Sequence, residues 1–183
     1  MLTTKLVTTD QELLQIAALS KANLSTGLTA EEKAKEGFVS WLYTPEILRT
    51  IHDIVPSVIV KDGDNLAGYA LTLTRACSPI YPNMAISEAW LSSISYKGRL
   101  LGEQRYYLMG QICIAEPYRG RGLVGMLYEY HRQHFSPQFD FLVTEISTAN
   151  PRSLKAHQKV GFKTIITHND ADGEWDTVLW DWT

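Results

Sequence analysis

An apolar run enters a glycine-rich turn in the stretch Ile112-Cys113-Ile114-Ala115-Glu116-Pro117-Tyr118-Arg119-Gly120-Arg121-Gly122. The run predicts a strand, and a helical pattern starts directly after the turn at Leu123. The N–H groups of such a turn and the positive end of the helix dipole face the same point, which suits a phosphate group. Gly120 and Gly122 give a phosphate access to the backbone, and Arg119 and Arg121 add positive charge beside it. The stretch therefore indicates a phosphate site, although a turn of this composition is by itself more often only a turn.

Two other phosphate-binding motifs do not fit this turn. A P-loop needs Lys followed by Ser or Thr after its last glycine, whereas Gly122 is followed by Leu123 and Val124. A dinucleotide-binding fingerprint stands early in its domain, with an acidic residue about 20 residues further on, whereas this turn lies about two-thirds along the chain. The sequence therefore argues against a nucleoside triphosphatase and against a dinucleotide cofactor.

Length and composition limit the class of protein. With 183 residues, 45% hydrophobic and 20% charged, the chain fits one globular domain, and we expect residues 1–183 to form it. The formal net charge of -3 removes the broad basic surface that is typical of nucleic-acid binding. The N-terminus has no signal-peptide pattern, no apolar run reaches membrane-spanning length, and Cys77 and Cys113 are too few for a disulfide framework. We therefore expect a cytoplasmic protein with reduced cysteines, no nucleic-acid partner and no membrane association.

The remaining patterns alternate between strands and helices. Alternating or apolar runs predict strands at 3–9, 57–61, 66–73, 106–114, 139–146, 162–167 and 175–182. Helix signals occur at Asp10 as an N-cap, at 29–32, 44–46, 86–94 and 151–160, and in the segment with Leu123, Leu127, Tyr130 and His134. Residues 76–104 form a long irregular insertion, which in a compact domain is often functional. This order predicts a mixed α/β fold whose second half is strand, glycine-rich turn, helix, strand, helix and hairpin.

A second motif follows the first after one predicted strand. It reads Asn150-Pro151-Arg152-Ser153-Leu154-Lys155-Ala156-His157-Gln158-Lys159-Val160-Gly161-Phe162. By itself, Asn150 before Pro151 indicates a helix N-cap, and Gly161 indicates a helix end. Together, the two motifs resemble those of the GNAT superfamily of acyl-CoA-dependent N-acyltransferases, which combines Arg/Gln-x-x-Gly-x-Gly/Ala with a later Asn, a small residue, an aromatic proton donor and Gly-Phe. The resemblance covers about residues 105–182, and the N-terminal half matches only in its order of elements.

The resemblance implies a fold class and a co-substrate. The fold would be α/β (α+β), a central mixed, mostly antiparallel twisted sheet of about seven strands, flanked by helices and splayed between strands 4 and 5. A bulge at Gly110-Gln111 would open the splay, although a strand glycine is also compatible with packing alone. The co-substrate would be acetyl-CoA, with no metal. By this resemblance the pantetheine arm pairs with the backbone of Ile112, Cys113 and Ile114. The pyrophosphate binds the N–H groups of Arg119, Gly120, Arg121, Gly122, Leu123 and Val124, and the cofactor also lies against Asn150, Ser153 and His157.

Acyl transfer from a thioester to an amine needs a base for the amine, stabilisation of the oxyanion and a proton for the leaving thiolate. His157 stands where the family usually has Tyr. A His with an ordinary pKa of about 6.5 is able to protonate a thiolate whose pKa is about 8.5. Packing against the cofactor is an equally good explanation of His157.

Glu145 is the candidate base. It interrupts an apolar strand shortly before Asn150, and burial at that position would raise its pKa and prepare it to accept a proton. The alternative is a strand-end glutamate that is paired with an arginine such as Arg152. Weaker candidates, in turn or insertion contexts that are more often solvated, are Glu88, Glu103 and Glu116.

Two functions remain. One is an N-acetyltransferase that acts on an amine, either a small molecule or a peptide or protein amino group, and the other is a non-catalytic acyl-CoA-binding sensor or scaffold. Glu145 and His157 favour the enzyme. The acceptor pocket would be bounded by aromatic residues, which at such spacing are also typical of a core: Phe38, Trp41, Tyr43, Tyr81, Trp90 and Tyr96. The sequence does not identify the acceptor, and it leaves open whether the chain forms a homodimer.

Overall fold

The structure, a computed structural model, describes residues 1–27, 38–80, 82–171 and 173–183, so the helix start expected at 29–32 lies outside the described residues. Its strands are β1 (Leu2–Leu6), β2 (Val58–Asp62), β3 (Asn65–Leu73), β4 (Ser95–Tyr96), β5 (Arg99–Leu100), β6 (Tyr106–Ile114), β7 (Phe141–Ser147), β8 (Lys163–Asp170) and β9 (Gly173–Asp181). The α-helices in the described part are α1 (Asp10–Ala22), α3 (Pro45–Ile54), α4 (Pro82–Ser93), α5 (Leu123–Phe135) and α6 (Pro151–Val160). Short 3-10 turns are η1 (Ser25–Gly27), η2 (Arg75–Ile80), η3 (Leu101–Glu103) and η4 (Glu116–Tyr118).

A seven-stranded sheet organises these elements in the order β1-β2-β3-β6-β7-β9-β8. Its neighbouring strands are antiparallel except for β6 and β7, which run parallel. The short strands β4 and β5 form a separate antiparallel pair. The mixed α/β fold with a mostly antiparallel sheet is therefore confirmed.

The two parallel strands separate soon after they meet. They pair only between residues 106–108 of β6 and 141–143 of β7, although β6 continues to Ile114 and β7 to Ser147. In chain order these are the fourth and fifth strands of the sheet. The splay that the family resemblance implied is present at that place.

A bulge lies on the other side of β6, where the strand pairs with β3. Gly110 and Gln111 together occupy the space opposite the single residue Leu71. A Cβ atom at Gly110 would lie 2.4 Å from Cδ1 of Leu73 and 3.1 Å from the hydroxyl of Tyr43, so the close packing requires glycine there. This glycine therefore serves both the bulge and the packing, and the bulge lies just beyond Leu108, where the pairing of β6 with β7 ends.

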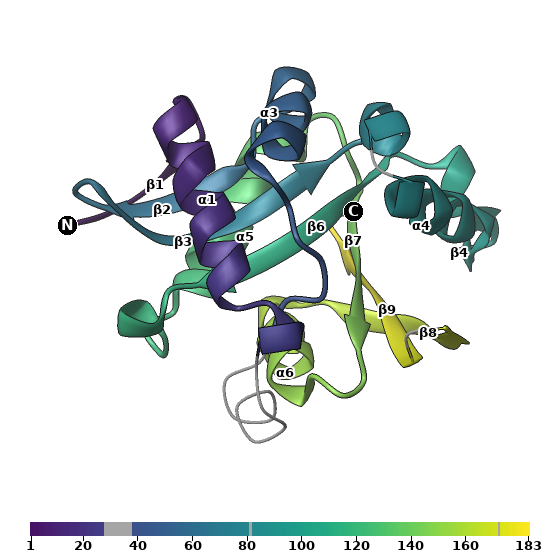
Figure 1. The fold of residues 1–183 in the computed structure, drawn as a ribbon. Coiled ribbons are helices and arrows are strands. Elements are labelled where there is room, and N and C mark those ends of the chain that lie inside the picture. Colours follow the sequence, from purple (N-terminus) through teal and green to yellow (C-terminus); the bar gives the residue numbers. More distant parts are fainter. Residues whose placement is uncertain (28–37, 81, 172) are drawn as a thin grey trace.

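Helices cover both faces of the sheet (Figure 1). α1 and α3 pack against each other on one face, and α5 contacts β1, β2, β3 and β6 on the other. α6 packs against α5 and β7, near the end of the sheet where β6 and β7 have separated. In the part of the chain that the structure describes, no helix is long and apolar enough to span a membrane.

The insertion between β3 and β6 is more regular than the sequence suggested. It contains η2, α4, the β4–β5 pair and η3, in place of irregular chain. α4 begins at Pro82 rather than at residue 86. Proline is well tolerated in the first turn of a helix, because the N–H groups there have no intrahelical acceptor. The sequence analysis placed the helix signal at 86–94 within an irregular insertion and therefore missed the first turn of α4.

The buried face of α5 also differs from the prediction. The leucines of this face are buried as expected, but Tyr128 and His131 are buried where the sequence favoured Tyr130 and His134. Tyr and His occur on both faces of this helix, so periodicity alone did not separate the two sets. One ring nitrogen of His131 has a partner from β6, since its Nδ1 lies 2.9 Å from the hydroxyl of Tyr107.

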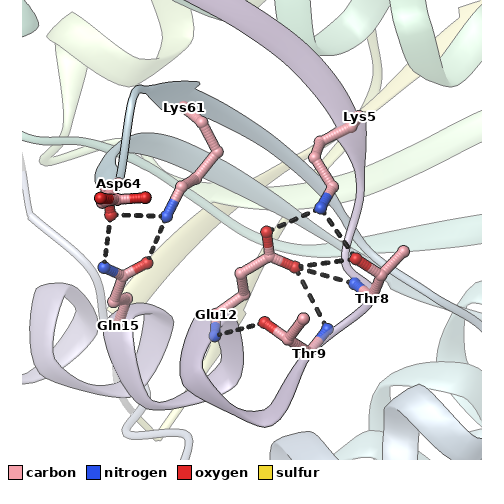
Figure 2. Close-up of polar contacts among 7 residues, drawn as sticks. All are labelled: Lys5, Thr8, Thr9, Glu12, Gln15, Lys61 and Asp64. Atoms are coloured by element: carbon pink, nitrogen blue, oxygen red, sulfur yellow. Dashed lines mark hydrogen bonds and ion pairs between the residues drawn. The ribbon is translucent and has the colours of Figure 1, made fainter.

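A network of polar contacts fixes the start of α1 (Figure 2). Thr9, rather than Asp10, is the N-cap, and its hydroxyl accepts a hydrogen bond from the N–H of Glu12 at 3.3 Å. In return, Oε2 of Glu12 accepts from the N–H groups of Thr8 at 2.8 Å and Thr9 at 3.2 Å. Lys5 of β1 donates to Oε1 of Glu12 at 2.8 Å. The nearly buried carboxylate therefore joins the first strand to the first helix, and a capping box of this kind satisfies N–H groups that the helix leaves unpaired.

Replacing Glu12 with Gln should lower the free energy of unfolding by about 1 kcal/mol near neutral pH, the usual cost of a lost cap or charged hydrogen bond. Burial alone would raise the pKa of Glu12, but the hydrogen bonds from Lys5, Thr8 and Thr9 outweigh burial and lower the pKa. A lowered folded-state pKa means that the stabilisation is present above the unfolded pKa and is lost as the pH falls through the folded pKa. Urea denaturation at a series of pH values should therefore show the two proteins converging in acid.

The control for this experiment is Glu46→Gln. Glu46 is an exposed carboxylate in the first turn of α3, which Thr44 caps. This change should have a smaller effect than Glu12→Gln. Equal losses in the two variants would show that the network around Glu12 contributes no more than an exposed first-turn carboxylate.

Candidate functional site

The glycine-rich turn presents the start of α5 to solvent. Gly120 and Gly122 have φ angles of +74° and +79°, in the left-handed region that favours glycine. Gly122 is the N-cap of α5, and a Cβ atom built on either glycine would meet nothing within 4 Å. The N–H groups of the first helical residues, Leu123 and Val124, have no intrahelical acceptor and lie at the positive end of the helix dipole. The turn therefore has the open space and the backbone donors that a pyrophosphate needs.

The two arginines of the turn make contacts within the protein. Arg119 donates from Nε to the carbonyl of Ile114 at 3.3 Å and from Nη2 to Oδ1 of Asn23 at 2.7 Å. Arg121 lies over the ring of Tyr118, with its guanidinium carbon 5.4 Å from the ring centroid. Arg119 thus ties the turn to the ends of β6 and α1. The capacity of the turn to hold an anion then rests on its backbone donors more than on its arginine side chains.

A groove runs from this turn along α6. Among its lining residues are all those predicted to bind the cofactor except Arg121, namely Ile112, Cys113, Ile114, Arg119, Gly120, Gly122, Leu123, Val124, Asn150, Ser153 and His157. Three cationic residues of α6, Arg152, Lys155 and Lys159, also line the groove, and the sequence analysis missed them. Their spacing of three and four residues was the available signal, because it places them on one face of a helix. They give the groove positive charge that suits the phosphates of a nucleotide.

The end of β6 forms one wall of the groove. Its pairing with β7 stops at Leu108, so the side of the strand that faces β7 is left for another partner beyond that residue. Burial raises the pKa of Cys113 to about 12, and Arg119 offsets only part of this effect. The thiol of Cys113 is therefore neutral near neutral pH.

Asn150 joins α6 to the segment at Phe38. It is the N-cap of α6, and its Oδ1 accepts from the N–H of Ser153 at 3.2 Å. Its Nδ2 donates to the carbonyl of Phe38 at 3.1 Å. The helix cap predicted from Asn150 and Pro151 is confirmed, and the same buried side chain lies on the wall of the groove.

A second cavity opens where β6 and β7 separate. Its walls come from the segment 38–43, α4, β6, β7 and the β8–β9 hairpin, and include Trp41, Tyr43, Met84, Ser87, Gln111, Thr144, Glu145, Asp170 and Trp175. Six residues line both the cavity and the groove: Phe38, Val39, Ile112, Asn150, Ser153 and His157. The groove and the cavity are therefore adjacent and share these six residues as a common wall.

Glu145 lies on the cavity wall, with its side chain 19% exposed. Burial raises its pKa to about 7, a hydrogen bond from Ser87 lowers it in part, and the negative charge of Asp170 adds to the increase. Nε2 of His168, on β8, lies 3.3 Å from Oε1 of Glu145, so the partner of this glutamate is His168 in place of the Arg152 that the sequence suggested. A carboxyl group with such a pKa readily exchanges a proton near neutral pH.

His157 is buried at the shared wall. Its Nδ1 lies 2.8 Å from the carbonyl oxygen of Ser153, which only accepts, so Nδ1 carries the proton and Nε2 accepts from the hydroxyl of Tyr128 at 2.6 Å. Burial lowers the pKa of His157 to about 4, although the bond to Ser153 opposes this shift. The ring is therefore neutral near neutral pH, with both nitrogens engaged inside the protein. These contacts favour the packing role that the sequence had left open.

The other predicted groups divide into those at the cavity and those away from it. Phe38, Trp41 and Tyr43 line the cavity as expected, whereas Trp90 and Tyr96 do not, and Tyr81 lies outside the described residues. The insertion contributes residues of α4 that the prediction did not name, Met84, Ser87 and Leu91. The weaker candidate bases Glu88, Glu103 and Glu116 line neither space. Within the described ranges, no three His, Cys, Asp or Glu side chains are grouped to hold a metal ion.

Comparison with known proteins agrees with this arrangement. The sequence profile of the family described as "Acetyltransferase (GNAT) family" matches residues 28–162. The protein yncA from Salmonella typhimurium, solved with acetyl-CoA, superposes with a TM-score of 0.68 at 12% identity, covering 100% of this chain and 95% of that one. An N-acetyltransferase from Staphylococcus aureus gives a TM-score of 0.65 at 16% identity, covering 100% and 99%. The ribosomal-protein-S18-alanine N-acetyltransferase from Escherichia coli gives a TM-score of 0.60 at 12% identity, covering 98% and 91%.

No curated protein matches the sequence. The family match nevertheless spans well over half of the chain, and it includes the turn, β7 and α6. The chain therefore belongs to the GNAT acetyltransferase family, whose fold it shares, and this supports acetyl transfer as its general activity.

Replacing Gly122 with Asp should weaken the binding of acetyl-CoA by about 100-fold or more, because it places a carboxylate against the site of the pyrophosphate. Gly122→Asn has the same shape and the same left-handed backbone strain without the charge, so it should bind acetyl-CoA more tightly than the Asp variant does. Titration calorimetry on the purified variants measures both affinities.

Gly98→Asp is the matched control for strain. Gly98 has a φ angle of +78° and open space around it, but it lies in the β4–β5 turn, which lines neither the groove nor the cavity. Gly98→Asp should lower the free energy of unfolding by about 1 kcal/mol, as Gly122→Asp should, while keeping its affinity for acetyl-CoA. If Gly122→Asp binds acetyl-CoA as well as Gly98→Asp does, the turn is not the pyrophosphate site.

Proposed function

We propose that this chain is an N-acetyltransferase that transfers an acetyl group from acetyl-CoA to an amine by direct attack on the thioester. The observation that supports this most is the meeting of groove and cavity at Asn150, Ser153 and His157, with Glu145 on the cavity wall. Bound in the groove, acetyl-CoA would supply the reactive thioester. The amine would occupy the cavity. The amine could belong to a small molecule or to a protein. The structural neighbour from Escherichia coli, named for a ribosomal-protein alanine, is an example of the second kind.

Glu145 is the proposed base. An alkylamine is protonated in water, with a pKa of about 10, and must lose a proton before its nitrogen attacks. Transfer of that proton to a group with a pKa of about 7 is uphill by about 3 units, or about 4 kcal/mol. Burial of the ammonium in the cavity lowers the pKa of the amine and so reduces this difference. Glu145 then accepts the proton directly or through a water molecule. The nitrogen forms the amide bond, the C–S bond of the thioester breaks, and the second proton of the nitrogen passes to the leaving thiolate of CoA, whose ordinary pKa is about 8.5.

Direct attack fits the state of the thiol in the groove. A covalent acyl-enzyme would need a nucleophile that is activated at its site, which for cysteine means a lowered pKa. Cys113, which lines the groove, has instead a pKa raised by burial to about 12. This thiol is therefore unsuited to carry the acetyl group.

For His157 we propose a positioning role. Donation of a proton from an imidazolium with a pKa of about 4 would need acidic conditions. The ring instead holds the carbonyl of Ser153 and the hydroxyl of Tyr128, and so fixes the wall at which the two spaces meet. A His at the family's Tyr position thus keeps the hydrogen bonds of the wall without acting as the acid.

Glu145→Gln should reduce kcat by about 10²–10⁴-fold, the usual contribution of a general base, with the affinity for acetyl-CoA nearly unchanged. Because the base acts when ionised, the rate of the wild type should rise with pH through about 7, where Glu145 titrates, and the variant should lack this rise. The measurement is acetyl-CoA consumption against pH, with an acceptor found by screening amines and peptides.

Glu103→Gln serves as the control, because Glu103 is exposed and lines neither space. It should leave both kcat and the pH profile unchanged. Wild-type turnover by Glu145→Gln would show that the base assignment is wrong. Acetyl-CoA binding without consumption of any amine or peptide would favour a non-catalytic acyl-CoA-binding module.

A further inference from the structure

The charges around the cavity limit the kind of amine that fits it. Two carboxylates line the cavity, Glu145 on the inner wall and Asp170 at the exposed end of β8. Among the lining residues that the structure describes, none is Lys or Arg. His168 contacts Glu145 from β8 without lining the cavity, and His157 is neutral near neutral pH. The described walls of the cavity therefore carry negative charge, to which Glu145 contributes when it is ionised, in contrast to the groove beside it, which carries the cations of α6.

The polar side chains deeper in the cavity are already engaged within the protein. Nε2 of Gln111 donates to the carbonyl of Trp41 at 2.7 Å, and its Oε1 accepts from Ser20 and Tyr69. The hydroxyl of Thr144 donates to the carbonyl of Met109 at 2.8 Å. An acceptor that carried a carboxylate would therefore meet negative charge without an opposing Lys or Arg from the described walls. Burying such an unpaired charge is costly.

Asp170 is held at the mouth of the cavity by the β8–β9 hairpin. Its Oδ1 accepts from the indole N–H of Trp175 at 2.9 Å and from the N–H of Gly173 at 3.1 Å. Trp175 also lines the cavity, so a carboxylate and an aromatic ring stand together at its entrance. Both features attract a cation, the first by charge and the second by its ring face.

We propose, on the basis of the acetyltransferase function above, that the acceptor is a small amine that carries positive charge and no carboxylate. Its reacting nitrogen lies beside Glu145, and Asp170 draws the cation in and favours a second positive charge near the entrance. Free amino acids are excluded as acceptors. If the α-amino group reacted, the α-carboxylate would lie beside Glu145. If a side-chain amino group reacted, the α-carboxylate would lie near Asp170, where the proposal places a second positive charge.

Pairs of compounds that differ by a single carboxylate test this directly. The pairs are 1,5-diaminopentane with lysine and tyramine with tyrosine, titrated calorimetrically into the protein saturated with CoA. Each amine should bind at least about tenfold more tightly than its amino acid, because the carboxylate of the amino acid would meet like charge without a described Lys or Arg to oppose it. Equal or tighter binding of the amino acids would overturn the proposal. Binding of an unblocked tripeptide by a protein that binds neither amine would also overturn it.

The role of Asp170 is tested with Asp170→Asn, which keeps the acceptor oxygen for Trp175 and removes the charge. It should weaken the binding of 1,5-diaminopentane about threefold, the usual size of a solvent-exposed charge interaction, and this loss should shrink at high salt. Asp176→Asn is the control, because Asp176 is on the same hairpin and does not line the cavity. Equal effects of the two variants would show that Asp170 does not select the acceptor.

Binding and turnover separate the two proposals. If the amines bind more tightly than the amino acids but acetyl-CoA is not consumed, the transferase function is wrong and the charge selectivity stands. If an amino acid binds as tightly as its amine and both are acetylated, the function stands and the selectivity is wrong.

Discussion

Gly110 and Gln111 of β6 lie opposite one residue of β3, and this mismatch bends β6 at the point where it parts from β7. A regular strand would continue to pair with β7, because unpaired N–H and C=O groups inside a sheet are costly. The bulge therefore opens both the groove and the cavity. Glycine is required because Leu73 packs against the Cα of Gly110, closer than any Cβ atom would permit.

The amide of Gln111 holds the bulge in place. It accepts hydrogen bonds from Ser20 of α1 and Tyr69 of β3, and it donates to the carbonyl of Trp41. Replacing Gln111 with an apolar residue would remove the acceptor of the buried hydroxyls of Ser20 and Tyr69, at a cost of about 1–3 kcal/mol for each group left unsatisfied. One buried side chain thus connects α1, the sheet and the segment 38–43, which lines the cavity. These contacts stabilise the bulged part of β6 next to the splay.

The parts of the fold that local signals determine could be predicted closely. The bounds of α6 follow from Asn150, Pro151 and Gly161, and those of β6 follow from its apolar run. The environment of His157 could not be predicted, because its partner Tyr128 comes from a different helix and the pKa depends on burial by both. The same limit applied to the acceptor cavity, whose α4 residues are brought to β7 only by the tertiary fold. Sequence thus predicted the residues of the groove, which follow from local patterns, far better than those of the cavity, which is assembled from distant segments.

The guanidinium of Arg119 donates hydrogen bonds to the carbonyl of Ile114 and the side chain of Asn23, so the groups of the turn that could hold an anion are mainly backbone N–H groups. A main-chain N–H is present whatever side chain it carries, provided that the glycines keep their left-handed geometry. Anion binding at the turn itself would therefore depend on the backbone geometry of the glycines more than on the other side chains of the turn. Under the proposed function, side chains around the cavity could be replaced to admit a different acceptor while the backbone of the turn continued to hold the same donor.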